Sequence, residues 1–138
     1  MLRFPLLIAL FAASLPAAAG NLLTASEAFP IQAHATADGG VILMVGIEPG
    51  YALYRRKFAV AGGGGFAVSA VDMPRGTVVD DPDLGPLEQY TAARVSVAIT
   101  GEGLGTGASL SVTLQGCAPA FGVCFNPITR SIPIVALP

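Results

Sequence analysis

Short segments that alternate apolar with polar or small residues dominate the chain beyond its first two dozen positions. Residues 95–99 (VSVAI) and 110–114 (LSVTL) show the alternation most clearly, with the period of two that half-buried antiparallel strands have. Following this pattern along the chain predicts seven strands, at residues 31–37, 41–47, 51–60, 66–73, 94–100, 109–115 and 130–135. Most of these strands are expected to place one face in a core.

Turn-forming residues separate these segments at short intervals, and no segment has the 3.6-residue period of a helix. Many short strands with such punctuation predict an all-β fold, an immunoglobulin-like two-sheet antiparallel β-sandwich. Four consecutive glycines at 62–65 are expected to form a flexible hairpin loop. The longest stretch without strand character, residues 77–93, is expected to be a loop that either carries function or is simply solvated.

The start of the chain has the three-part pattern of a secretory signal peptide. Arg3 precedes an apolar run over residues 4–15, and small residues lead to a natural cleavage position after Ala19. We therefore expect residues 1–19 to be a cleaved signal peptide and residues 20–138 to form one domain. Export places this domain in an oxidising compartment, which in a Gram-negative cell is the periplasm.

The charges of the chain exclude several functional classes. Residues 20–138 carry six cationic and nine acidic side chains, a net charge of −3 with His34 neutral. Without clustered positive charge, we expect no nucleic-acid binding, and the run at residues 55–57 is expected to be a solvated strand edge. His34 is the only histidine and is expected on the surface, so a soft-metal site that joins it to the cysteines is a minor alternative. We expect no metal and no cofactor.

Cys117 and Cys124 are the only cysteines, and six residues separate them. This spacing fits neither a Cys-x-x-Cys redox motif nor half of a zinc site. If the chain turns back between them, they face each other across the neck of a hairpin, where a disulfide would stabilise the fold by about 2.5 kcal/mol. Spacing and composition alone favour a structural staple over a redox pair. Phe121 and Phe125 offer apolar surface for a partner, although Phe125 is expected to alternate into the core.

Several motifs in order carry a family resemblance. They are GYALYR at residues 50–55, MPRG at 73–76, the acidic segment up to EQY at 88–90, and QGC followed by CFNP at 115–127. Together they resemble the N-terminal periplasmic domain of the thiol:disulfide interchange protein DsbD family, over about residues 25–133. The resemblance implies an immunoglobulin-like sandwich whose cysteine pair takes electrons from a membrane-embedded partner and passes them to periplasmic thioredoxin-fold proteins.

The resemblance also implies roles for individual residues. Cys124 is expected to join mixed disulfides with partners, and Cys117 to resolve them. A cap is expected to cover the cysteines until a partner displaces it, and other side chains are expected to line the site. The cap residues are Asp81, Asp83, Leu84 and Gly85, and the lining residues that the resemblance implies are Tyr54 and Glu88. The flanking sequence adds Phe121 and Phe125 to the expected lining.

The chain departs from the family pattern in three ways. The intercysteine loop is one residue longer than usual, and Asp83-Leu84 stand where the family typically has aromatic residues. We also expect no membrane domain and no thioredoxin-like domain after Pro138. We therefore expect a monomeric thiol-disulfide oxidoreductase module whose membrane-embedded electron donor is encoded separately. The alternative is a non-catalytic immunoglobulin-like binding module with a structural disulfide.

Overall fold

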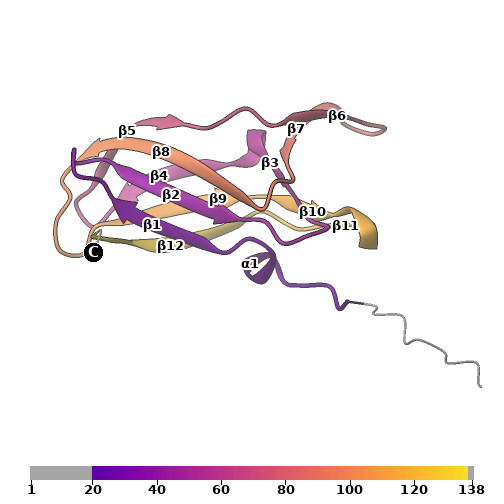
Figure 1. Cartoon of the computed structure of the whole chain (residues 1–138), viewed down its shortest axis with the longest axis horizontal. Helices are drawn as coiled ribbons and strands as arrows, with labels where there is room; N and C mark the ends of the chain where they lie inside the picture. Colours follow the sequence, from indigo (N-terminus) through magenta and orange to yellow (C-terminus); the bar gives the residue numbers. More distant parts are fainter. Residues whose placement is uncertain (1–19, 137–138) are drawn as a thin grey trace, which may run out of the picture.

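A computed structural model describes residues 20–136, so the predicted signal peptide lies outside the described residues. The chain forms two sheets within one elongated body (Figure 1). One short α-helix and two 3₁₀ turns interrupt the strands. The elements are α1 (Ala25–Ala28), β1 (Ile31–Ala35), β2 (Val41–Gly46), β3 (Ala52–Tyr54), η1 (Arg55–Lys57), β4 (Ala59–Gly63), β5 (Ala67–Asp72), β6 (Thr77–Asp81), β7 (Gly85–Tyr90), β8 (Arg94–Glu102), β9 (Ser109–Leu114), β10 (Gly116–Ala118), η2 (Pro119–Phe121), β11 (Val123–Cys124) and β12 (Ile128–Val135).

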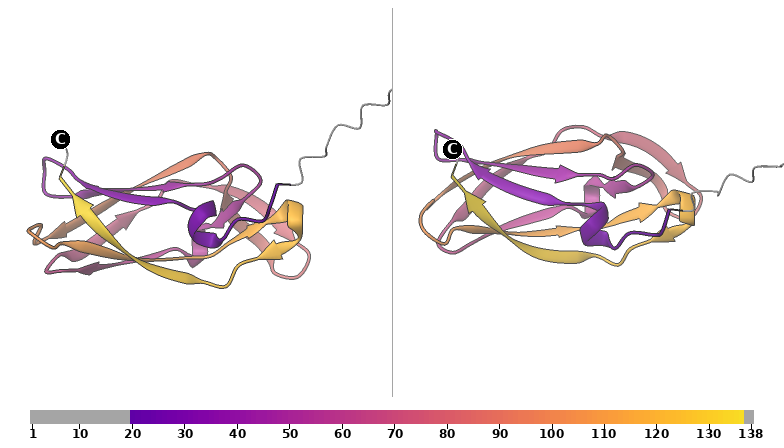
Figure 2. Two further views of the ribbon diagram at one scale, coloured as in Figure 1. Left: turned by 90° about the horizontal axis from the view of Figure 1, so that it is seen from below. Right: turned by 60° about the horizontal axis from the view of Figure 1, so that its bottom comes forward.

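The larger sheet has seven strands in the order β4-β9-β12-β1-β2-β8-β5. Its edge strands β4 and β5 are consecutive in the chain and are joined only by residues 64–66, so the sheet must fold over on itself to bring its edges together. The fold lies at the pairing of β1 with β12, whose ends meet near the C label, in indigo and yellow, in Figure 2. That pair is parallel, whereas the other strand pairs in the described chain are antiparallel. The result is the predicted immunoglobulin-like sandwich.

The core lies between the two layers of this folded sheet. In β8 and β9 every second side chain is buried, as the alternating pattern of the sequence predicts. The same holds for β2. Burying these aliphatic side chains is the main favourable term that holds the layers together. The strands contribute Val95, Val97, Ile99, Leu110, Val112, Leu114, Val41, Leu43 and Val45, each no more than 4% exposed.

The smaller sheet has five strands in the order β11-β10-β3-β7-β6 and lies at one end of the sandwich (Figure 1). Its strands are short. The inner strands β3 and β10 are mostly buried, the edge strands β6 and β11 bury no residue, and Leu53 of β3 pairs with Tyr90 of β7. β11 and β6 form its two edges. This sheet carries both cysteines and the segment predicted to be the cap.

Two of the sequence-based predictions about the strands are wrong. The segment 51–60 is not one strand, because β3 and β4 belong to different sheets and η1 turns the chain between them. Three consecutive cationic side chains at 55–57 cannot alternate into a core, so the chain leaves the sheet at this point. The segment 77–93 is not a loop, because β6 and β7 pair from Thr77 with Gln89 to Asp81 with Gly85. An edge hairpin buries few side chains, which is why it carries no alternating pattern.

Smaller differences also have local causes. Only Gly64 and Gly65 make the predicted glycine turn, both with positive φ, whereas Gly62 and Gly63 are paired with β9. The helix α1 is only four residues long, too short to show a period, and the Thr24–Glu27 capping box supports it. Within residues 20–136, no helix has the length and apolar character needed to cross a membrane.

Candidate redox site

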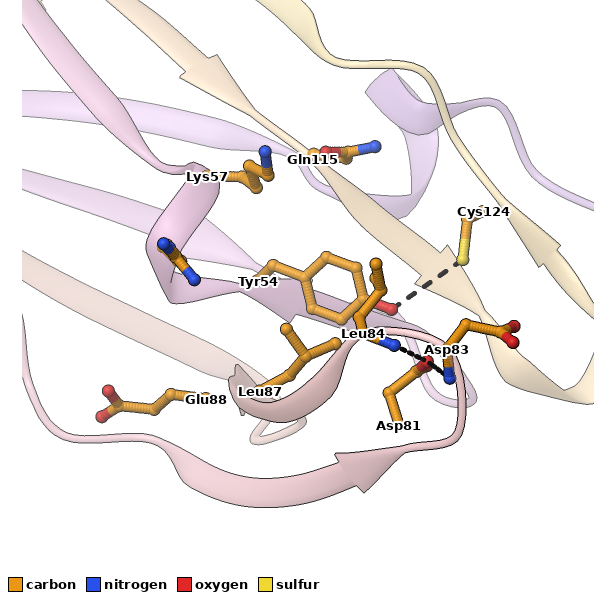
Figure 3. A pocket seen from close by; sticks show the side chains of 10 residues that line it. Tyr54, Lys57, Asp81, Asp83, Leu84, Leu87, Glu88, Gln115 and Cys124 are labelled. Atoms are coloured by element: carbon orange, nitrogen blue, oxygen red, sulfur yellow. Dashed lines mark hydrogen bonds between the residues drawn. The ribbon is translucent and has the colours of Figure 1, made fainter.

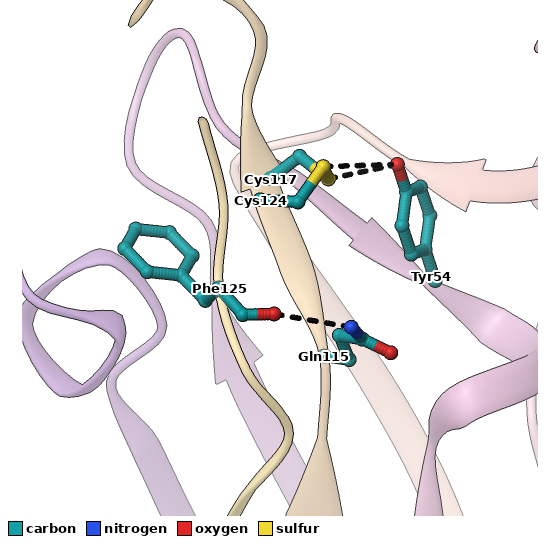
Figure 4. The surroundings of a disulfide bond; sticks show 5 residues. All are labelled: Tyr54, Gln115, Cys117, Cys124 and Phe125. Atoms are coloured by element: carbon teal, nitrogen blue, oxygen red, sulfur yellow. Dashed lines mark hydrogen bonds between the residues drawn. A yellow bond between two sulfur atoms is a disulfide. The ribbon is translucent and has the colours of Figure 1, made fainter. Parts of the chain in front are cut away.

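Cys117 and Cys124 are joined by a disulfide across the neck of a hairpin (Figure 4). Cys117 in β10 lies directly opposite Cys124 in β11, and their Cα atoms are 3.9 Å apart. The 3₁₀ turn η2 takes up the middle of the intervening segment, and Gly122 then reverses the chain with a φ of 63°. This left-handed conformation suits glycine, which has no Cβ to clash with the backbone. The geometry confirms that the two cysteines meet at a hairpin neck.

The two sulfur-bearing residues differ in their access to solvent. Cys117 is 4% exposed, because β10 lies between β11 and β3 and pairs with both. Cys124 is an exposed residue on β11, the outermost strand of the smaller sheet. A thiolate that attacks a disulfide needs a line of approach to one of its sulfurs. On this strand arrangement, Cys124 offers that approach and Cys117 does not.

The hydroxyl of Tyr54, at the end of β3, lies beside the disulfide. Its oxygen is 2.8 Å from Sγ of Cys117 and 3.8 Å from Sγ of Cys124. A disulfide sulfur carries no proton, so Tyr54 must be the donor of these contacts. Burial raises the pKa of Tyr54 above its ordinary value of 10.0, and the negative charge of Asp81 raises it further. The hydroxyl therefore remains a donor at neutral pH.

The predicted cap residues form the tip of the β6–β7 hairpin. Oδ1 of Asp81 accepts hydrogen bonds from the backbone N–H groups of Asp83 (2.8 Å) and Leu84 (2.9 Å), which shapes the turn that ends at Gly85. Leu84 is 68% exposed. Since Cys124 is exposed as well, the cap in this conformation leaves the outer cysteine open to solvent.

A pocket of about 630 Å³ lies between this hairpin and the disulfide (Figure 3). Cys124 and Tyr54 line it, together with residues of η1 and of the hairpin. Six of its lining residues are predicted site residues: Tyr54, Asp81, Asp83, Leu84, Glu88 and Cys124. The other four were not predicted: Arg56, Lys57, Leu87 and Gln115. Arg56 and Lys57 were expected to lie on a solvated strand edge. They line the pocket because the 3₁₀ turn η1 takes them out of the strand, and the periodicity of the sequence does not predict this turn.

Glu88 lies in the wall of this pocket and anchors the hairpin. Its Oε1 accepts a hydrogen bond of 2.8 Å from the backbone N–H of Gly76, and its Oε2 lies 3.3 Å from Nη1 of Arg55. The Arg55 guanidinium also donates to the backbone carbonyls of Met73 and Pro74. These contacts tie β7 and the segment before β6 to η1, so Glu88 supports the site by fixing the base of the cap hairpin.

The two predicted phenylalanines have different surroundings. Phe121 in η2 is 44% exposed and, with Val123 at 36%, adds apolar surface beside Cys124. Phe125 packs inward, with its ring stacked on Tyr51 at a centroid distance of 6.2 Å and edge-on to Phe29 at 6.2 Å. The strand-based prediction of a core role for Phe125 agrees with this packing, and Phe121 is the one that a partner can reach.

Other chemistry finds no support in the described part of the chain. Across residues 20–136, no three His, Cys, Asp or Glu side chains gather in a group that could hold a metal ion. His34 lies on β1 in the larger sheet, with Nε2 3.5 Å from the side-chain oxygen of Gln32. The smaller sheet carries the Cys117–Cys124 disulfide, a bond that thiolates can exchange.

Comparison with known proteins identifies the domain. The family model for the N-terminal region of the thiol:disulfide interchange protein DsbD matches residues 19–136. DsbD from Cronobacter sakazakii is 42% identical over 91 residues, which cover 66% of this chain and 15% of that protein. DsbD from Tatumella citrea is 30% identical over 114 residues, 83% of this chain and 19% of that protein. The chain thus matches less than a fifth of the length of these relatives.

Solved structures agree with the sequence comparison. The reduced DsbD N-terminal domain of Neisseria meningitidis superposes with a TM-score of 0.68 at 28% identity, covering 83% of this chain and 90% of that one. A structure of the complex between the DsbD N-terminal and PilB N-terminal domains of the same organism gives a TM-score of 0.67 at 27% identity, covering 83% and 88%. The chain belongs to the family of DsbD N-terminal domains.

Proposed function

We propose that this domain is a thiol-disulfide oxidoreductase module that passes electrons through Cys117 and Cys124 to thioredoxin-fold partners. The observation that carries the proposal is the unequal access to the two sulfurs, with Cys124 exposed on an edge strand and Cys117 buried. Exchange requires one sulfur that a partner can reach and a second that stays within the domain. The complex of the related Neisseria domain with a PilB domain supports a protein as the partner.

In the reduced domain, the Cys124 thiolate attacks a partner disulfide. A bond forms between Cys124 Sγ and one partner sulfur, and the other partner sulfur leaves as a thiolate. The Cys117 thiolate then attacks Cys124 Sγ, which re-forms the intramolecular bond and releases the second partner sulfur. Two electrons pass to the partner, and its two thiolates take up protons according to their pKa values. The same exchange steps in the reverse direction let the electron donor reduce the Cys117–Cys124 disulfide again.

Tyr54 and the cap support this chemistry. Because the Tyr54 hydroxyl lies within hydrogen-bonding distance of Cys117 Sγ, it stabilises negative charge on that sulfur whenever Cys117 leaves or attacks. The β6–β7 hairpin tip, Asp81 to Gly85, lines the pocket beside Cys124 without closing it in this conformation, and it moves when a partner docks. Phe121 contributes apolar surface to the docking face.

The proposed setting is the periplasm. Residues 1–19 act as a cleaved signal peptide, and residues 20–138 form the mature domain. A membrane-embedded protein supplies electrons, and the domain works as a monomer. The membership of the chain in the DsbD N-terminal family supports this assignment.

Trapping of mixed disulfides tests the proposal. With Cys117→Ser, the thiol of Cys124 has no resolving partner and should accumulate intermolecular disulfides with thioredoxin-fold proteins from a periplasmic extract. With Cys124→Ser, the remaining thiol is buried and should trap few. Each variant differs from the wild type by a single sulfur atom replaced with oxygen, so each serves as the matched control of the other. Equal trapping by both, or trapping by neither, would contradict the proposed role of Cys124.

A further inference from the structure

The pocket beside Cys124 has walls of opposite charge. The 3₁₀ turn η1 contributes the cationic side chains of Arg56 and Lys57, and the tip of the cap hairpin contributes the carboxylates of Asp81 and Asp83. In Figure 3, Lys57 lies on one side of the Tyr54 ring and the two aspartates on the other. Cys124 opens into the same pocket, so any ligand held between the two walls lies next to a reactive sulfur.

Three of these four charges are available to a ligand. In the described residues 20–136, the single ion pair joins Arg55 to Glu88, a further acidic residue of the pocket lining. It involves none of the four side chains named above. Arg56, Lys57 and Asp83 are exposed. Asp81 is different, because its Oδ1 already accepts the two backbone N–H groups of the hairpin tip. The pocket therefore presents two free cations on one wall and one free carboxylate on the other.

The size and position of the pocket favour a small ligand. Its volume of about 630 Å³ lies in the range of about 300 to 1,000 Å³ that small-molecule sites occupy. Leu84 is the exposed apolar side chain of its lining, whereas Phe121 and Val123, which suit a protein surface, lie outside it. A ligand that complements this pocket carries a carboxylate for Arg56 and Lys57, an ammonium group for Asp83, and a thiol for Cys124.

We propose that the pocket recognises small zwitterionic cysteine peptides, which exchange with the Cys117–Cys124 disulfide. The proposal rests on the proposed function, because it needs a disulfide that is open to exchange. The peptide thiolate attacks Cys124 Sγ, a new sulfur–sulfur bond forms between peptide and Cys124, and Cys117 leaves as a thiolate that Tyr54 stabilises. A second peptide thiolate then attacks the peptide sulfur, which releases the peptide disulfide and leaves Cys124 reduced. Two peptide thiols are thereby oxidised and the domain gains two electrons.

Reduction kinetics with charged and neutral thiols test the proposal. The full mature domain, oxidised, is mixed with excess glutathione or with 2-mercaptoethanol, and the reaction is quenched with acid and followed by mass spectrometry. The measured quantity is the glutathione rate divided by the 2-mercaptoethanol rate, compared between each variant and the wild type. This comparison cancels both the difference in intrinsic nucleophilicity between the thiols and any change in the reactivity of the disulfide itself. Arg56→Glu and Lys57→Glu should each lower this ratio by about three- to tenfold. The effect should shrink in about 0.5 M salt, because salt screens exposed charges.

A matched control is Arg94→Glu, which makes the same change of charge on β8, outside the pocket. Its ratio should equal that of the wild type. The opposite wall is tested with N-acetylglutathione, which lacks the ammonium group. Wild-type protein should react more slowly with N-acetylglutathione than with glutathione. Asp83→Asn should remove this difference in rate. Asp80→Asn, on the edge strand β6, should leave the difference unchanged.

The outcomes separate this proposal from the proposed function. If Arg56→Glu, Lys57→Glu and Arg94→Glu give the same ratio as the wild type while 2-mercaptoethanol reduces all of them, the pocket does not recognise the peptide and the proposal is overturned. Exchange at Cys124 would still stand. If neither thiol reduces the disulfide, although dithiothreitol reduces it after unfolding in urea, both the pocket proposal and the proposed function fail.

Discussion

The hydroxyl oxygen of Tyr54 lies 2.8 Å from Sγ of Cys117 and 3.8 Å from Sγ of Cys124. The nearer sulfur is the buried one, and the farther sulfur is the one that a partner can reach. Attack on Cys124 expels Cys117 as a thiolate, so the donor is placed at the leaving sulfur. This arrangement favours attack at Cys124 electrostatically as well as sterically.

Tyr54→Phe is therefore expected to slow the reduction of the disulfide. The variant keeps the ring and removes only the donor to the Cys117 thiolate. A hydrogen bond to a charged group contributes about 1.5 to 3 kcal/mol, and partial exposure at this site reduces that to a loss in rate of about five- to tenfold. The second-order rate constant with dithiothreitol at fixed pH measures the effect. A rate equal to that of the wild type would rule out this role.

The titration of Tyr54 predicts how stability changes at alkaline pH. Burial and the charge of Asp81 raise the pKa of Tyr54 in the folded protein above 10.0, so the folded state holds this proton more tightly than the unfolded state does. The resulting stabilisation is complete below pH 10 and is lost as the pH rises through the higher folded pKa. Urea unfolding from pH 8 to pH 11 should show this loss in the wild type. Tyr54→Phe should show a smaller one.

The Arg55–Glu88 clamp at the base of the cap hairpin gives a third prediction. Glu88→Ala removes the partner of Arg55 and the acceptor of the Gly76 N–H, and should cost about 1 to 2 kcal/mol of unfolding free energy. Glu88→Gln keeps an acceptor for the Gly76 N–H but loses the ion pair with Arg55, which is partly exposed, so it should cost less than about 1 kcal/mol. Amide hydrogen exchange of Gly76 should speed up much more in the alanine variant. Equal exchange in the two variants would mean that the clamp does not hold the hairpin.

Gly122 tests the turn that brings the cysteines together. Its φ of 63° is a conformation that costs an L-residue about 1 kcal/mol, so Gly122→Ala should lower the stability of the oxidised domain by about that amount. Gly105→Ala is a suitable control, because that glycine has no positive φ and a Cβ there would contact nothing within 4 Å. Thermal unfolding of the two variants provides the comparison. The control should unfold close to the wild-type temperature.

The parts of the fold that were predictable are those in which burial imposes a pattern. The strands β8 and β9 alternate because one face of each lies in the core, and the meeting of the cysteines follows from the turn between them. The β6–β7 hairpin buries few side chains and leaves no such trace. The contact of Tyr54 with Cys117 joins residues 63 positions apart, and only the family resemblance pointed to it. The placement of Arg56 and Lys57 in the pocket depends on the 3₁₀ turn η1. A run of three charged residues has no periodic pattern from which such a turn could be predicted.

The midpoint potential of the Cys117–Cys124 disulfide tests the central claim most directly. The mature domain is equilibrated in dithiothreitol buffers of defined potential at neutral pH, and the reduced fraction is measured by alkylation and mass spectrometry. An exchange module should give a midpoint in the range of known exchange proteins, between about −270 and −120 mV. A midpoint below about −300 mV would mark a structural bond that resists cellular thiols, and would contradict the assignment of this domain to electron transfer.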